Sequence, residues 1–118
     1  KNWHTFTIRN KRKSGSKTEY EKRKEAIQKG YLYPQLTVQA YVTEKDKIIS
    51  FAIAKTIDII SMIDNGYCFK NHTGVDQIGQ AEFFIVDWYD MKNKGYNIFI
   101  KEYVKEIEED IGNLILEL

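Results

Sequence analysis

The residues best suited to chemistry in this sequence are a set of cations near its start. Residues 1–30 contain ten Lys or Arg and three Glu, a net charge of +7, whereas residues 31–118 carry a net charge of −6. Such a split is typical of a chain with an arm that faces a polyanion. Flexible cations beside hydroxyl donors bind phosphate without reading bases. We therefore expect nucleic-acid contacts from a basic loop and the helix after it: Arg9, Lys11, Arg12, Lys13, Lys17, Lys22, Arg23 and Lys24.

The same charge pattern also fits two other interpretations. A lysine-rich loop can serve solubility alone, and a basic surface can dock on an acidic protein. That protein could be a second copy, because residues 101–118 have a net charge of −4 and end in the apolar run 114–118. Four apolar residues in five exceed what one helix face buries, and symmetric dimers are the commonest oligomers. A homodimer is therefore the default partner among proteins.

Four possible metal ligands recur at every fourth position: Asp64, Cys68, His72 and Asp76. On one continuous helix they would share a face, but Asn65-Gly66 interrupts the helix. Structural zinc also prefers two or more thiolates. The sequence therefore favours a core cysteine and a loop histidine, and predicts neither a metal site nor a cofactor.

A second group of acids would suit a metal-dependent phosphoryl hydrolase or nuclease, in which carboxylates hold a cation and a lysine steadies the phosphate. The acids are Asp76, Glu82, Asp87 and Asp90, and the lysine is Lys92. However, positions 82 and 87 fall on opposite faces of a strand, and positions 90–92 are expected in a turn. Neither histidine has a recognisable catalytic partner in the sequence. We therefore expect no catalytic residue, and keep the hydrolase as the alternative.

Composition sets the broad class. The chain has 118 residues, of which 42% are hydrophobic and 30% charged, as in ordinary globular proteins. No apolar run approaches the roughly 20 residues that span a bilayer, and residues 1–9 lack the apolar core of a signal peptide. The single cysteine, Cys68, suits a reducing compartment. These features predict one cytoplasmic domain over residues 1–118 with no membrane contact.

Local patterns predict the elements of the first half. Alternation predicts a strand at 3–8, followed by a flexible basic loop at about 9–18. Thr18 and Glu21 form a capping-box pattern that starts a helix, and Gly30 stops it. Period-two alternation at 36–42 and 48–54, around a turn at 44–47, predicts a hairpin.

The second half mixes short strands and helices. We expect a helix from an N-cap at Thr56 to about residue 65, a strand at 67–69 and a loop at 71–79. A strand at 82–88 is expected to pair with 96–100 across a turn at 90–95. The end of the chain has an amphipathic helical pattern with apolar residues at Val104, Ile107, Ile111, Leu114, Ile115 and Leu118.

Together these elements predict an α+β fold, with an antiparallel sheet of four to six strands and two or three helices packed on one face. The predicted core comprises Phe6, Ile8, Val38, Ala40, Val42, Ile49, Phe51, Ile53, Ile60, Ile63, Phe83, Ile85, Val86, Ile107, Ile111 and Leu114. The function expected is that of a non-enzymatic binding or accessory module that contacts nucleic acid. A protein-interaction or inhibitor domain is the second interpretation.

Overall fold

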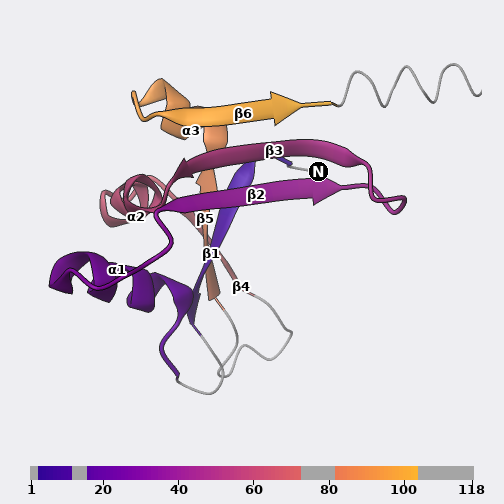
Figure 1. The fold of residues 1–118 in the computed structure, drawn as a ribbon. Helices are drawn as coiled ribbons and strands as arrows, with labels where there is room; N and C mark the ends of the chain where they lie inside the picture. The colour runs from indigo at the N-terminus through magenta and orange to yellow at the C-terminus, as the bar shows by residue number, and fades with distance from the viewer. Residues whose placement is uncertain (1–2, 12–15, 73–81, 104–118) are drawn as a thin grey trace, which may run out of the picture.

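The part of the chain that the structure describes contains six strands and three helices, and every strand pairing in it is antiparallel (Figure 1). The computed structural model describes residues 3–11, 16–72 and 82–103. The predicted α+β class is confirmed. The elements follow the order β1 (Thr5–Lys11), α1 (Glu19–Lys29), β2 (Leu36–Val42), β3 (Ile48–Lys55), α2 (Thr56–Asp64), β4 (Phe69–His72), β5 (Glu82–Asp87), α3 (Trp88–Asn93) and β6 (Ile98–Glu102).

The strands are divided between two sheets rather than joined in one. Sheet A has the order β1-β5-β4 and sheet B the order β2-β3-β6. In Figure 1 the strands of sheet B run across those of sheet A, and α1 and α2 lie together on one side. Helix α1 contacts β1, and α2 contacts both β3 and β5. The two helices therefore pack where the sheets meet.

The link between β5 and β6 differs from the predicted hairpin. The segment expected as a turn is helix α3, because the Asp87 side chain accepts hydrogen bonds from the N–H groups of Tyr89 and Asp90, each at 2.9 Å. Trp88 and Met91, three residues apart, are both fully buried. Strand β6 then pairs with β3 instead of β5. The predicted pairing of 82–88 with 96–100 is wrong, since α3 carries the chain from sheet A to sheet B.

Strand β2 turns its polar side inward, which reverses part of the predicted core. Val38, Ala40 and Val42 are exposed, whereas Gln39 and Tyr41 face β1. In the described part of the chain β1 is an edge strand of sheet A, and its backbone groups meet the inner side of sheet B. Buried backbone groups must be paired, so polar side chains take the inward positions.

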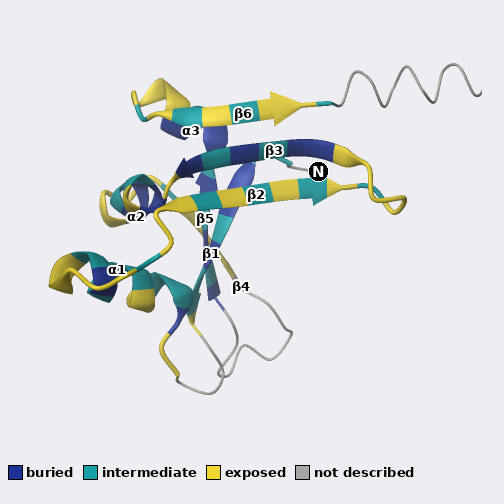
Figure 2. Cartoon of the chain, in the orientation of Figure 1, coloured by how far each residue is buried: buried dark blue, intermediate teal, exposed yellow. Residues whose placement is uncertain are grey.

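A cluster of buried side chains joins both sheets with α2 and α3, and the partly buried Tyr20 and Ile27 of α1 pack against it (Figure 2). Six predicted core residues are buried: Phe6, Ile8, Ile49, Ile60, Ile63 and Val86. Four other predicted core residues are half-buried: Phe51, Ile53, Phe83 and Ile85. Side chains alternate along a strand, and the inward positions belong instead to neighbours such as Ala52, Ala54 and Phe84. The predicted core positions Ile107, Ile111 and Leu114 lie outside the described residues.

The predicted helix starts are correct for α1 and wrong for α2. Thr18 and Glu21 form the capping box, and Gly30 ends α1 with φ 71°. In α2 the N-cap position belongs to Lys55, whereas Thr56 is the first helical residue and donates its hydroxyl hydrogen to the carbonyl of Pro34 at 2.5 Å. None of the three helices in the described ranges is long and apolar enough to cross a bilayer.

Two strand boundaries also shift. Strand β1 runs through Lys11, so the predicted basic loop begins later than residue 9. The extension follows from pairing, because Arg9 lies opposite Phe83 on β5. Strand β4 starts at Phe69 and continues to His72, beyond the predicted strand at 67–69.

Candidate nucleic-acid interface

Three of the eight predicted binding residues line one hollow between β1 and α1. Arg9, Lys22 and Arg23 surround an open cavity of about 560 Å³, together with Glu19. Lys11 is exposed at the end of the same strand. The structure thus brings together cations that are more than ten positions apart in the sequence.

Local structure explains how these side chains meet. The capping box starts α1 so that Lys22 and Arg23 lie three and four positions after Glu19, which places them on the same side of the helix as Glu19. On β1, the Arg9 guanidinium lies 5.1 Å from the centre of the Phe83 ring. This cation–π contact holds the charge at the surface of sheet A, beside the helix.

The charges in the hollow are unbalanced. Among the described residues that line it, Glu19 is the carboxylate, and it lies 3.9 Å from an Arg23 guanidinium nitrogen. That distance is longer than a hydrogen bond, so Glu19 accepts none from the five N–H donors of the guanidinium. Three cations against one acid produce a positive surface suited to an anion.

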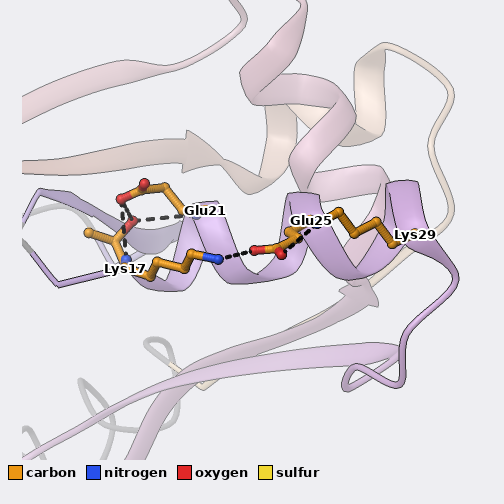
Figure 3. A network of polar contacts seen from close by, with 5 residues as sticks. Lys17, Glu21, Glu25 and Lys29 are labelled. Carbon is orange, nitrogen blue, oxygen red and sulfur yellow. Dashed lines mark hydrogen bonds and ion pairs between the residues drawn. The ribbon is translucent and has the colours of Figure 1, made fainter.

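Lys17 precedes α1 and is paired with a carboxylate of that helix (Figure 3). Its ammonium group donates to Glu25 at 2.5 Å, and Glu25 also accepts from Lys29 at 3.0 Å. The Glu25 hydrogen bond raises the pKa of Lys17, and the bonds from Lys17 and Lys29 lower the pKa of Glu25. The charge of Lys17 is therefore largely offset within this exposed pair.

Lys24 forms part of the contact between α1 and α2. Its ammonium donates to the Tyr20 hydroxyl at 3.2 Å and to Asp64 at 3.3 Å, and Tyr20 donates to the same carboxylate at 2.5 Å. Tyr20 and Asp64 raise the pKa of Lys24, and burial, followed by the Asp64 bond, raises that of Tyr20. These residues border a second hollow of about 630 Å³ that also includes Cys68 and Lys70. Arg12 and Lys13 lie outside the described residues.

The described acids of the alternative hydrolase site are separately engaged. Glu82 accepts a hydrogen bond from Asn10, Asp87 caps α3, and Asp90 pairs with Lys94 at 2.6 Å. Glu82 and Asp87 stand at opposite ends of β5, about 17 Å apart at the usual rise per residue. Asp76 lies outside the described residues.

The possible metal ligands at every fourth position, where the structure describes them, also have separate structural roles. Asp64 ends α2 and is bonded to α1, whereas Cys68 is half-buried and burial raises the pKa of its thiol. His72 ends β4, and Asp76 lies beyond the described strand. Within residues 3–11, 16–72 and 82–103, no three His, Cys, Asp or Glu side chains gather to hold a metal ion.

A polar cluster that the sequence analysis missed joins the two ends of the described chain. His4 Nε2 contacts one Glu102 oxygen, and the Tyr89 hydroxyl donates to the other. Burial, with the Glu102 bond, raises the pKa of Tyr89 to about 12. The Tyr89 bond, and then His4, lower the pKa of Glu102. The cluster ties β1, α3 and β6 together, and its members are too distant in sequence for a spacing pattern to reveal it.

Within the described part of the chain, the hollow lined by Arg9, Lys22 and Arg23 thus gathers three of the predicted cations around one open space. Comparison of the chain with protein-family models, with curated proteins and with solved structures gives no match.

Proposed function

We propose that this protein is a non-enzymatic nucleic-acid-binding module of the accessory kind, which contacts phosphates through Arg9, Lys22 and Arg23, with Lys11 at the margin. The observation that supports this proposal is the open hollow, whose described lining has three cations and one carboxylate. Phosphate oxygens are recognised by charge and by guanidinium donors. The partners are nucleic-acid strands, whose phosphates are closely spaced.

The binding proposed is independent of base sequence. The three cations come from a strand and a helix and surround one open hollow, rather than following one helix that could enter a groove. Contacts to phosphate position a protein on nucleic acid but carry no sequence information. Affinity should therefore follow charge and salt rather than base composition.

Fluorescence anisotropy with labelled duplexes tests this function. Two duplexes of equal length and unrelated sequence should give the same affinity within about threefold, and log K should fall with log salt. Three phosphate contacts correspond to a slope of about −2.7 on duplex DNA. Absence of binding at about 50 mM salt, or a strong preference for one duplex, would overturn the proposal.

The hydrolase alternative gives a different result in the same sample. Incubation of either duplex with the protein and Mg²⁺ should leave the DNA intact, because the described carboxylates do not converge. Cleavage that is lost in Asp87→Asn would replace the binding module with an enzyme. Asparagine also caps helices, so Asp87→Asn should keep the cap of α3 and stay folded while it removes the carboxylate.

A further inference from the structure

Sheet A has a second face, on the side away from the buried core, here called the aromatic face. The core side of β1 and β5 carries buried residues such as Phe6 and Phe84, and the Lys70 ammonium of β4 lies on that side, 5.7 Å from the centre of the Phe84 ring. Alternation places the residues between these on the opposite side of the sheet. The aromatic face therefore includes Thr7 and Arg9 of β1, Phe83 and Ile85 of β5, and Phe69 and Asn71 of β4.

Two phenylalanine rings are neighbours on this face. Phe69 lies opposite Ile85, and Asn71 lies opposite Phe83, so the two phenylalanines are diagonal neighbours on adjacent strands. Diagonal neighbours in an antiparallel pair are typically about 7–8 Å apart, within reach of aromatic side chains. Phe69 is 71% exposed and Asn71 is exposed, whereas Phe83 is half-buried. Exposed apolar side chains that gather on one surface indicate an interaction site.

Arg9 connects the aromatic face with the hollow. Its guanidinium lies 5.1 Å from the centre of the Phe83 ring, and the same side chain lines the hollow with Lys22 and Arg23. A nucleic acid with phosphates in the hollow would therefore have the aromatic face beside its bases. In a duplex the bases are stacked on one another, but the bases of a single strand can be splayed out and stacked on aromatic rings or on a guanidinium plane.

We propose that the hollow and the aromatic face together bind single-stranded nucleic acid, with bases stacked on Phe69 and on the pair formed by Arg9 and Phe83. The inference rests on the proposed function, because the hollow supplies the phosphate contacts. Proteins that bind single strands combine cations along the nucleic-acid backbone with aromatic rings for the bases. Every base has a π face, so stacking tolerates any sequence, in agreement with binding that is independent of base sequence.

Charge and polarity favour a nucleic-acid strand over an apolar protein surface as the occupant of this face. The Arg9 guanidinium complements phosphate oxygens. Asn71 is exposed opposite Phe83, and its amide both donates and accepts hydrogen bonds, so it can bond either kind of group on a base edge. The acid of β5 on this side, Asp87, stands at the end of the strand away from Phe83 and caps α3. Its charge is therefore not beside Arg9.

Fluorescence anisotropy at one low salt concentration tests the inference with three labelled probes. These are a single-stranded DNA of mixed sequence, the RNA of the same sequence, and the duplex that the DNA forms with its complement. Phe69→Ala should weaken the binding of at least one single-stranded probe by about fivefold or more, the smallest loss expected when a stacked base loses its aromatic partner. Duplex affinity should change by less than about twofold, because the phosphate contacts remain. Phe69→Trp keeps an aromatic ring and should restore the binding of single strands.

Phe99→Ala is the matched control, because Phe99 is a 55% exposed phenylalanine on β6, at the edge of sheet B as described. Both replaced rings are exposed, so both variants should stay folded, and Phe99→Ala should leave all three affinities unchanged. An equal loss in the two alanine variants, no loss on either single strand in Phe69→Ala, or failure of Phe69→Trp to restore binding overturns the stacking proposal. With duplex binding intact, the hollow would still be a phosphate site; failure of the wild-type protein to bind any probe would instead refute the proposed function itself.

Discussion

The side-chain oxygen of Gln39 accepts a hydrogen bond from the backbone N–H of Thr7 at 2.9 Å. This bond satisfies a donor on the edge of sheet A with a residue of sheet B. The next inward residue, Tyr41, donates to the carbonyl of Thr5 at 3.0 Å. The two sheets are thus joined by polar side chains that meet an otherwise unpaired strand edge.

Replacement of Gln39 by leucine should lower the free energy of unfolding by about 1–3 kcal/mol, because the Thr7 N–H would be left without its acceptor in a partly buried position. Urea unfolding followed by circular dichroism measures the change. Gln39→Glu retains an acceptor and is the control, expected to cost less. Equal stability of Gln39→Leu and wild type would show that this hydrogen bond does not stabilise the contact between the two sheets.

The capping box of α1 offers a second stability prediction. Thr18→Ala removes the acceptor for the Glu21 N–H and should cost about 1 kcal/mol, within a range of about 0.5–2 kcal/mol. Thr18→Ser retains the hydroxyl and should remain close to wild type. The same unfolding measurement applies, and a loss of equal size in both variants would assign the effect to the buried methyl group instead.

Stability at high pH should depend on Tyr89. Its folded pKa of about 12 lies above the ordinary value of 10, so neutral Tyr89 stabilises the fold fully below pH 10. That contribution is lost as the pH rises from about 10 through about 12. Tyr89→Phe should therefore show a flatter decline of unfolding free energy over this window than wild type. Parallel curves for the two proteins would contradict the assignment.

Glu102 should act in the opposite pH range. Its folded pKa is lowered from 4.5, first by the Tyr89 bond and then by His4. Its stabilising contribution is therefore present above the unfolded value and is lost as the pH falls through the folded one. Glu102→Gln should reduce the acid-induced loss of stability below about pH 4.5, whereas Glu44→Gln, in the exposed β2–β3 turn, should not.

Lys22 of α1 and Lys17, which precedes the helix, should differ in their contribution to DNA binding. Lys22 lines the hollow, whereas Lys17 is paired with Glu25. Lys22→Gln should reduce the magnitude of the salt slope by about 0.9, and Lys17→Gln should change it by less than half as much. Both variants remove one charge, so equal effects would mean that net charge, rather than the hollow, controls binding.

The sequence predicted features that depend on nearby residues. Thr18, Glu21 and Gly30 define α1 through contacts within a few positions, and the β2–β3 hairpin follows from alternation and a short turn. The orientation of β2 could not be predicted, because it depends on the edge of β1, some 30 residues earlier. The binary pattern alone therefore placed Val38 and Val42 in the core.

The candidate site was predictable in part for the same reason. Charge density identified the segment that contains Arg9, Lys22 and Arg23, but only the packing of α1 beside β1 shows that these three line one hollow. The partners of Lys17 and Lys24 distinguish them from that set. The contact of His4 with Glu102 spans 98 positions, beyond the reach of any local spacing.

The most direct test of the proposed function compares two triple variants by salt-dependent anisotropy. Arg9→Gln, Lys22→Gln and Arg23→Gln together remove the cations of the hollow, and Lys45→Gln, Lys47→Gln and Lys92→Gln remove the same charge from exposed positions elsewhere. The account predicts that the first variant loses about 2.7 from the magnitude of the slope, while the second stays within about 0.5 of wild type. Equal slopes for the two variants, with both proteins folded, would contradict a nucleic-acid interface at this hollow.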